Sequence, residues 1–148
     1  MIKVRSLQPE DRSEWVRLRL ALWPDHDIAE LEKEAEAIAA NCKTQAIFVA
    51  ERPEGGLCGM AEFSIRTRAE GCQTKNVGYI EGWFIDTDMR QKGIGRQLVT
   101  SGETWARSHG CKEMASDTKL KYPISPLAHE ALGYREVGRT THFSKTLR

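Results

Sequence analysis

Residues 77–96 read V-G-Y-I-E-G-W-F-I-D-T-D-M-R-Q-K-G-I-G-R, and this stretch decides the fold. Its first part is apolar and aromatic, which indicates a buried strand. Its second part is a basic loop in which Gly93 and Gly95 lie at the start of an amphipathic helix. The first N–H groups of a helix have no partner within it and carry the positive end of its dipole, so this junction predicts a phosphate site. The loop also carries three cations: Arg90, Lys92 and Arg96.

Two common nucleotide-binding motifs are missing from this junction. The dinucleotide fingerprint G-x-G-x-x-G fails because Leu98 occupies the position of its third glycine. The triphosphate-binding pattern G-x-x-x-x-G-K-[ST] does not occur in the chain. The sequence therefore argues against a dehydrogenase and a nucleotide triphosphatase. The remaining pattern, R-x-x-G-x-G after a strand and before a helix, is also compatible with a glycine turn that merely starts a surface helix.

Length and charge set the broad class of the protein. A chain of 148 residues can bury one good core, so we expect a single domain, 1–148. Its 22 basic and 21 acidic residues give a net charge of +1, which predicts no nucleic-acid or anionic-membrane partner. No apolar run approaches the roughly 18 residues of a membrane span, and the first residues, M-I-K-V-R-S, lack a signal-peptide block. The sequence therefore predicts a soluble, cytoplasmic chain.

The cysteines predict no metal or disulfide. Four are present, widely spaced, with no C-x-x-C pair and no histidine at zinc-finger spacing: Cys42, Cys58, Cys72 and Cys111. They are interpreted as ordinary reduced thiols, with a metal or disulfide role as the alternative. A cysteine nucleophile paired with a histidine is supported by no motif.

The N-terminal part predicts a strand and two helices. Ile2, Val4 and Ser6 alternate as in a half-buried strand, and a helix follows between Pro9 and Pro24. A second helix is expected to bury one face: Ile28, Leu31, Ala35 and Ile38. The segment 25–36 holds six carboxylates against one lysine. Such a run is usually a solvated helix face, and the alternative is an acidic rim that attracts a cationic substrate.

The rest of the chain predicts strands at 46–50, 57–66, 77–85, 111–116 and 134–145. A helix is expected from the glycine loop to residues 109–110, followed after the strand at 111–116 by a loop at 118–125 and a short helix at 126–132. The first strands form antiparallel hairpins, and the glycine loop is the centre of a strand-helix-strand unit. The order therefore predicts an α/β fold with a mixed sheet.

At this point a family resemblance becomes visible. The pattern of Arg90, Gly93 and Gly95 resembles the acetyl-CoA pyrophosphate loop of the GNAT acetyltransferase superfamily. The predicted order of elements is similar to the GNAT order over nearly the whole chain, and H-E-A-L-G-Y at 129–134 resembles its last motif. The resemblance implies a GNAT fold, acetyl-CoA as cosubstrate and no metal.

A closer resemblance is to the chromosomal type of aminoglycoside 6′-N-acetyltransferase. It rests on L-W-P (22–24), S-I-R (64–66), I-E-G (80–82), G-C-K-E-M-A-S-D-T (110–118) and the H-x-A-L-G-Y tail. It implies acetylation of the 6′-amino group of an aminoglycoside, hence antibiotic resistance, and a homodimer. Two alternatives stay open: acetylation of a polyamine, peptide N-terminus or lysine, and a CoA-binding module without turnover.

The resemblance also implies roles for particular residues. Main-chain groups of Trp83, Phe84 and Ile85 would bind the pantetheine arm. The pyrophosphate would be held by the loop residues Gln91, Lys92, Gly93, Ile94, Gly95 and Arg96. Tyr122 stands about where the family often has a cofactor-binding asparagine. His129 takes the place of a tyrosine that protonates the leaving thiolate, although a histidine packed beside the cofactor is the commoner outcome.

For the acceptor, the matching positions are Trp23, Glu81 and Asp117. An ammonium must lose a proton before it can attack a thioester, and a carboxylate can both bind it and take that proton. Glu81 and Asp117 are therefore the predicted catalytic residues. The family's tyrosine after S-I-R has no counterpart here, and its acidic residue near the C-terminus maps to Gly138. Glu136 lies two positions earlier and can substitute if its side chain points the same way.

Overall fold

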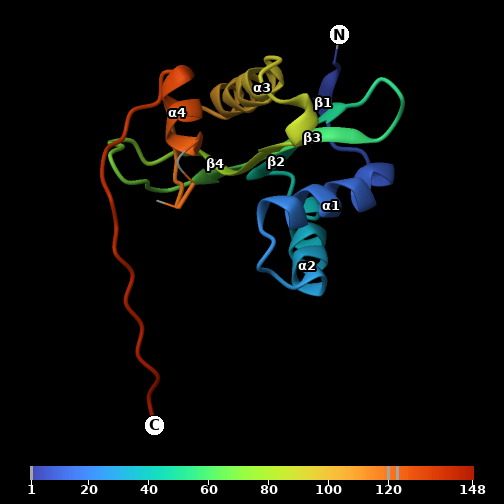
Figure 1. Ribbon diagram of the computed structural model, residues 1–148. Coiled ribbons are helices and arrows are strands. Elements are labelled where there is room, and N and C mark those ends of the chain that lie inside the picture. The colour runs from blue at the N-terminus through green and yellow to red at the C-terminus, as the bar shows by residue number, and fades with distance from the viewer. Residues whose placement is uncertain (1, 120, 123) are drawn as a thin grey trace.

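The computed structural model describes residues 2–119, 121–122 and 124–148 (Figure 1). Two positions of the predicted loop 118–125, Leu120 and Pro123, lie outside the described residues. The strands are β1 (Val4–Ser6), β2 (Gln45–Glu51), β3 (Leu57–Arg66), β4 (Val77–Ile85) and β5 (Glu113–Ser116). The helices are α1 (Arg12–Leu22), α2 (Ile28–Ala39), α3 (Ile94–Ser108) and α4 (Ile124–Ala131), with 3-10 turns η1 (Pro9–Asp11) and η2 (Thr87–Met89).

The five strands form one mixed sheet in the order β1-β2-β3-β4-β5. Strands β1 to β4 pair with one another in antiparallel fashion, and β5 pairs with β4 in parallel. The predicted hairpin of β2 and β3 is confirmed, and its turn is closed by the bond from Arg52 N to Gly56 O at 2.9 Å. The glycine loop and α3 connect the two parallel strands β4 and β5, as the sequence predicted.

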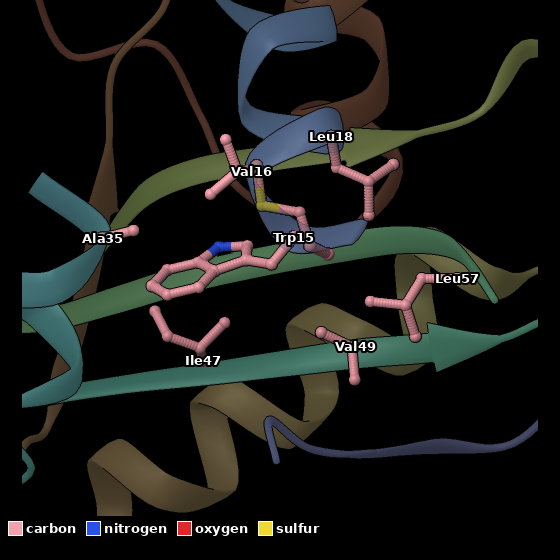
Figure 2. Packing of buried hydrophobic residues seen from close by; sticks show 8 residues of the cluster. Trp15, Val16, Leu18, Ala35, Ile47, Val49 and Leu57 are labelled. Carbon is pink, nitrogen blue, oxygen red and sulfur yellow. The ribbon is translucent and has the colours of Figure 1, made fainter. Parts of the chain in front are cut away.

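Helices cover both faces of the sheet (Figure 1). Helices α1 and α2 lie on one face, and α3 packs on the other across β1 to β4. Alternate residues of each strand therefore enter two cores. Under α1 and α2, the indole of Trp15 lies over Ile47 and near Ala35, in one cluster with Val49 and Leu57 (Figure 2). Under α3, Phe63 and Ile80 pack against Leu98.

Helix α3 lies unusually close to the sheet because a glycine faces it. A Cβ added at Gly102 would lie only 2.1 Å from the ring of Phe63. In α2 the predicted face is partly wrong: Leu31 and Ala35 are buried, but Ile28 is 50% exposed because the buried side of the helix begins at Leu31.

Several element boundaries differ from the prediction. The strand predicted to begin at Cys111 begins at Glu113, because the N–H of Cys111 bonds back to Ala106 O at 3.0 Å and so completes the end of α3. The short helix begins at Ile124 rather than Pro126, and ends at Ala131. A proline is tolerated in the first turn of a helix, where its missing N–H leaves no bond unmade.

The predicted last strand is wrong. Residues 134–148 form no strand and extend away from the sheet (Figure 1). The course of this segment is set near its start, where Val137 packs on Gly71 of the β3–β4 loop. A strand needs a neighbouring backbone for its N–H and C=O groups, and the segment meets none along the described chain. Phe143 and Leu147 consequently stay 91% and 85% exposed.

The structure also bears on membrane spans and on the cysteines. Among the described residues, no helix is long and apolar enough to cross a membrane. All four cysteines are free thiols, with Cys58 and Cys111 buried.

Candidate active site

Strands β4 and β5 separate after a short parallel pairing, and this opening organises the site. Their last paired residues are Ile80 and Ser116. The following residues, Glu81 and Asp117, therefore stand at the point of separation. Beyond it, the edge of β4 that faced β5 has no strand partner in the described part of the chain, so its main-chain groups from residue 81 to 85 can bind an extended ligand.

Glu81 is placed by a β-bulge. The β3–β4 register pairs Glu62 with Gly82 but Phe63 with Ile80, so Glu81 is the extra residue of β4. A bulge re-aims a side chain and interrupts the ladder. Here it presents the carboxylate to β3, where Arg66 donates two hydrogen bonds, from Nε at 2.8 Å and from Nη2 at 2.7 Å, and the Ser64 hydroxyl donates another.

Asp117 is connected to Glu81 through two side chains. The hydroxyl of Tyr79 donates a hydrogen bond to Asp117. The guanidinium carbon of Arg66 lies 3.5 Å from the ring centroid of Tyr79, over its face. Burial raises the pKa of Tyr79, and the bond to Asp117 raises it further, so the phenol stays protonated as a donor. The two predicted catalytic carboxylates therefore belong to one network.

A cavity of about 570 Å³ adjoins Glu81 on the α1 and α2 side of the sheet. Trp23, at the end of α1, lines it and lies over the backbone of β4, where a Cβ added at Gly82 would meet the indole at 2.9 Å. Glu34 and Glu62 line it as well. The cavity thus offers an aromatic wall and several carboxylates, which suit a cationic ligand with apolar faces. Asp117 is not part of its lining.

A buried ion pair forms one wall of this cavity. The side chains of Arg19 and Glu62 are 2% and 4% exposed, and Arg19 Nη1 bonds both carboxylate oxygens. The indole Nε1 of Trp15 donates a third bond to Glu62 at 2.9 Å. Burial raises the pKa of Glu62, and Arg19 opposes that effect. The guanidinium carbon of Arg19 lies 4.9 Å from the ring centroid of Trp23, so this pair also supports the aromatic wall.

The acidic run at 25–36 contributes to the cavity at one position. Glu34 lines it and pairs with Arg19 at 3.3 Å. Asp27 instead caps α2 by accepting a bond from Ala29 N. All six carboxylates are exposed. The run is mostly the solvated helix face that was expected, and the alternative of an acidic rim is limited to Glu34.

The glycine loop has the backbone of an anion site. Gly93 caps α3 with φ +82°, and a Cβ there would meet nothing within 4 Å, so the approach to its backbone is open. Gln91 also has a positive φ of +61°. The first N–H groups of α3, at residues 94–96, have no acceptor within the helix. Gly95 serves packing, since a Cβ there would lie 3.0 Å from the Trp83 ring.

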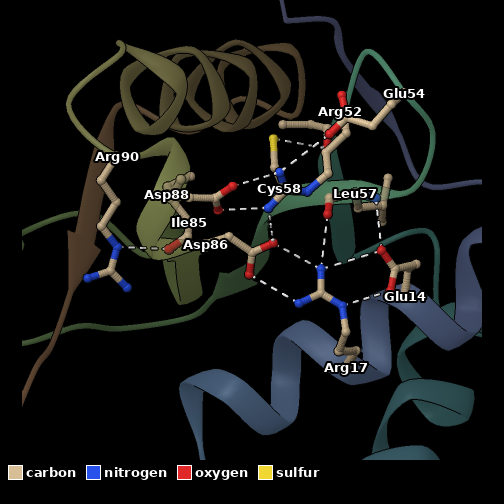
Figure 3. Close-up of polar contacts among 11 residues, drawn as sticks. Glu14, Arg17, Arg52, Glu54, Leu57, Cys58, Ile85, Asp86, Asp88 and Arg90 are labelled. Carbon is tan, nitrogen blue, oxygen red and sulfur yellow. Dashed lines mark hydrogen bonds and ion pairs between the residues drawn. The ribbon is translucent and has the colours of Figure 1, made fainter.

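Ion pairs anchor the base of this loop (Figure 3). Asp86, immediately after β4, accepts hydrogen bonds from Arg17 of α1 and Arg52 of the β2–β3 hairpin, each with a contact at 3.0 Å. Its N–H bonds Cys58 O at 2.8 Å. Burial favours a higher pKa for Asp86, but the two guanidinium groups outweigh it and lower the pKa. The loop therefore starts from a fixed point.

Comparison with known proteins identifies the family of this chain. A model of the acetyltransferase (GNAT) family matches residues 10–134. The chain belongs to the GNAT family. The predicted α/β GNAT fold with a parallel β4–β5 pair is thereby confirmed.

Proteins compared by sequence and solved structures both resemble this GNAT chain along nearly all of its length. Aminoglycoside N(6′)-acetyltransferase type 1 of Klebsiella aerogenes is 40% identical over 146 residues, covering 97% of this chain and 96% of that protein. The protein of the same name from Stenotrophomonas maltophilia is 34% identical, with 97% and 93% covered. The solved structure of AAC(6′)-Iy with the bisubstrate analog CoA-S-monomethyl-acetylneamine has a TM-score of 0.91 and 32% identity, covering 99% of each chain. That of AAC(6′)-Ih from Acinetobacter baumannii has a TM-score of 0.90, 32% identity and full coverage of both chains.

The remaining predicted GNAT site residues lie on the α3 and α4 side or outside the site. His129 packs edge-on between Trp83 and Tyr134, at 5.3 and 5.9 Å between ring centroids. Its Nε2 contacts the Ser116 hydroxyl at 2.8 Å and its Nδ1 the carbonyl of Ser125 at 2.7 Å. This is the packed histidine that the sequence argument considered commoner.

The buried indole of Trp83 indicates whether a cofactor can bind on this side of the sheet. Its Nε1 is buried and has no hydrogen-bond partner among the described residues. An unpaired buried donor is costly, so it favours a ligand acceptor beside β4. Together with the open backbone at Gly93, the chain fits acetyl-CoA. In the described part of the chain, no cluster of three or more side chains suited to a metal ion is present.

Tyr122 and Glu136 are not brought to the carboxylate network. Tyr122 is 38% exposed in the β5–α4 loop, with Lys121 over its ring. Glu136 lies on the exposed C-terminal segment and accepts a hydrogen bond from Arg139, three residues on. Its proposed role depended on a strand that is not formed.

Sequence reasoning missed five residues of the site: Arg19, Glu62, Ser64, Arg66 and Tyr79. Two of them, Ser64 and Arg66, were visible in the motif S-I-R but received no role. Glu62 carried a usable signal, since a carboxylate within the apolar strand 57–66 requires a buried partner. No comparable signal marks which residue that partner is.

Proposed function

We propose that the protein is an acetyl-CoA-dependent N-acetyltransferase that acetylates the 6′-amino group of aminoglycosides and so confers resistance to them. The observation that carries this proposal is the joint position of Glu81 and Asp117 where β4 and β5 separate, between the acidic cavity and the glycine loop. The relatives named for this activity match nearly the whole chain, which supports the same assignment.

The cofactor half of the proposal rests on backbone. Residues 83–85 of β4 bind the pantetheine arm along their free edge, and the loop 91–96 holds the pyrophosphate through its N–H groups. Acetyl-CoA supplies the acetyl group as a thioester, whose C–S bond breaks as the new amide C–N bond forms. Trp83 and His129 line the α3 side of the same opening.

The acceptor half rests on charge. Trp23 and the carboxylates of the cavity bind the ring and its ammonium groups. Glu81 is already engaged by Arg66 and Ser64, so it holds and orients the reacting ammonium. Asp117 has a single hydrogen-bond donor along the described chain, Tyr79, and is the better placed carboxylate to take the proton, directly or through water.

A first experiment decides among acceptor classes. Purified protein is incubated with acetyl-CoA and a panel of amines while thiol release is followed. The panel contains aminoglycosides with a 6′-amino or a 6′-hydroxyl group, spermidine, and a lysine peptide. We expect turnover only with 6′-amino compounds and a product acetylated at that nitrogen. Product on another nitrogen would remove the 6′ assignment, and no thiol release from any amine would favour a CoA-binding module.

A second experiment assigns the carboxylates. Asp117→Ala and Glu81→Ala should each keep acetyl-CoA affinity, since the cofactor is held by main-chain groups. Turnover should fall by about a hundredfold or more for Asp117→Ala, the scale of general-base contributions. Glu81→Ala should mainly raise KM for the aminoglycoside. Glu32→Ala, at an exposed carboxylate of α2, is the control and should match the wild type. Full turnover in both site variants would require a different base.

We also propose that the domain 1–148 works as a homodimer through its C-terminal segment. Val137, Phe143 and Leu147 are apolar and exposed on residues 134–148, and the outer edge of β5 has no strand partner in the described part of the chain. A second copy can supply that edge to the segment. Light scattering should give a dimer that Phe143→Glu weakens and Ser144→Glu leaves intact; a wild-type monomer at micromolar concentration would contradict this. We assign the dimer to the cytoplasm, where acetyl-CoA is made.

A further inference from the structure

We infer that Arg66 is the resident counter-ion of the acceptor site: its guanidinium occupies the ammonium position at Glu81, and the substrate binds by displacing it. The inference rests on the proposed amine acetylation, and it assigns a specificity-determining role to a residue outside the predicted site. It makes acceptor binding an exchange of one cation for another.

The geometry of Arg66 is that of a bound cation. Its Nε and Nη2 form a two-pronged contact with the two oxygens of Glu81 at 2.8 and 2.7 Å. This fork is the strongest arrangement that a guanidinium and a carboxylate make. An ammonium that binds the same carboxylate would lie against this guanidinium, and the repulsion between the two cations favours displacement of Arg66.

Arg66 is also free to move aside. It is the last residue of β3, pairing with Val77, and its side chain is 43% exposed. Solvent can therefore reach the guanidinium once it leaves Glu81, which limits the cost of breaking the pair. The guanidinium already stacks on the ring of Tyr79 at 3.5 Å while it bonds Glu81, and it can keep this contact when it releases the carboxylate, since the ring is 7% exposed and held by Asp117.

The net charge of the site determines how Arg66 affects the bound ammonium. Glu81, Asp117 and Arg66 together carry one net negative charge, which one substrate ammonium neutralises. Without Arg66 two carboxylates would face the ammonium. They would stabilise its protonated form and raise its pKa, which opposes the loss of the proton. Arg66 therefore weakens binding of the charged acceptor but helps the reacting nitrogen to become neutral.

Other charged side chains near Glu81 also act on the bound ammonium, and they stay in place when Arg66 is replaced. From α1, α2 and β3, the cavity beside Glu81 is faced by Arg19, Glu34 and Glu62. Arg19 pairs with both carboxylates. Hydrogen bonding to Glu81 raises the pKa of Arg66, so it stays charged throughout the working range. The change on removing Arg66 is therefore that of one full positive charge.

The test compares Arg66→Gln, Arg66→Lys and the control Arg68→Gln, an exposed arginine two residues further on. The acceptor is neamine, a small aminoglycoside with a 6′-amino group, and kcat and KM are measured across pH 5 to 9. For Arg66→Gln we expect KM to fall at least about fivefold. The acidic limb of kcat should move up by about one pH unit, which lowers kcat on that limb about tenfold. Arg66→Lys keeps the charge and should keep the wild-type limb.

The outcomes separate this inference from the proposed function. Wild-type protein that acetylates no amine would defeat the proposed function, whatever Arg66 does. Normal wild-type turnover with a raised KM in Arg66→Gln would show a plain substrate contact and overturn the inference. An unchanged acidic limb would overturn it as well. Melting curves of both Arg66 variants should match the wild type within about 2 °C, because an exposed pair contributes little to folding.

Discussion

Replacing Glu62 with alanine tests the buried wall of the acceptor cavity. The variant leaves the guanidinium of Arg19, only 2% exposed, without its main partner, and leaves the indole N–H of Trp15 without an acceptor. Breaking a buried ion pair by removing one member costs about 3–5 kcal/mol, because the remaining charge is uncompensated. Glu34 still contacts Arg19 at 3.3 Å but is 55% exposed, so it offsets little of this loss.

That loss is large for a domain of this size. Typical unfolding free energies are about 5–15 kcal/mol, so Glu62→Ala should remove about a fifth or more of the stability. Near 150 residues, a change of 1 kcal/mol moves Tm by roughly 2–4 °C, and we expect a fall of about 6–20 °C. Because Arg19 lies against Trp23, the folded variant should also show a raised KM for the aminoglycoside, with cofactor affinity unchanged.

The assay is urea unfolding followed by far-ultraviolet circular dichroism, with the slope m checked for two-state behaviour. Glu34→Ala is the matched control and should cost less than about 1 kcal/mol, since its contact with Arg19 is exposed. The double variant Arg19→Met with Glu62→Leu should recover most of the loss, because an apolar pair leaves no buried charge. Equal losses for Glu62→Ala and Glu34→Ala, or a double variant no more stable than the single one, would refute the reasoning.

Three further predictions address the loop, the α3 interface and pH. Gly93→Ala should weaken acetyl-CoA binding about tenfold and cost about 1 kcal/mol of stability, because φ +82° strains any side chain there. Calorimetric titration measures the acetyl-CoA affinity, and an unaltered affinity would remove the loop from the site. Gly102→Ala should lower Tm despite the higher helix propensity of alanine, because its Cβ would lie 2.1 Å from the buried ring of Phe63, and overpacking costs about 1–3 kcal/mol; an unchanged or raised Tm would contradict that contact. Asp86 has a lowered pKa in the folded state, so its contribution to stability is complete above its unfolded pKa of about 3.9 and is lost as pH falls through the lower folded pKa. Asp86→Asn should therefore destabilise the protein at pH 7 and reduce the acid-induced loss below pH 4 in urea titrations; the same pH dependence as wild type would refute it.

The elements predicted from the sequence were those whose signal is local. The hairpin of β2 and β3 and the strand β4 follow from runs of apolar residues, and the start and end of α3 follow from Gly93 and the pair at 109–110. The errors arose where a tertiary contact overrides the local pattern. The bond from Cys111 back to Ala106 delays β5, and the segment 134–145 forms no strand because no partner backbone from the described residues lies beside it.

The site divides in the same way. Glu81 and Asp117 could be selected from the sequence because each ends a recognisable strand, and the loop 91–96 because its glycines precede a helix. Their partners could not be selected. Whether Arg66 reaches Glu81 depends on the bulge that shifts β4 by one residue, and whether Arg19 meets Glu62 depends on how α1 lies across β3.

Residue types at short spacing along the chain were enough to predict the order of strands and helices up to α4, the glycine loop at the start of α3 and the family. The tertiary structure alone decided the charge of the acceptor site. It joins Glu81 and Asp117 through Arg66 and Tyr79, buries one ion pair in the cavity wall and leaves the C-terminal segment exposed. The physical reason is that electrostatic interactions depend on distance and burial in space, and neither is encoded in the spacing of residues along the chain.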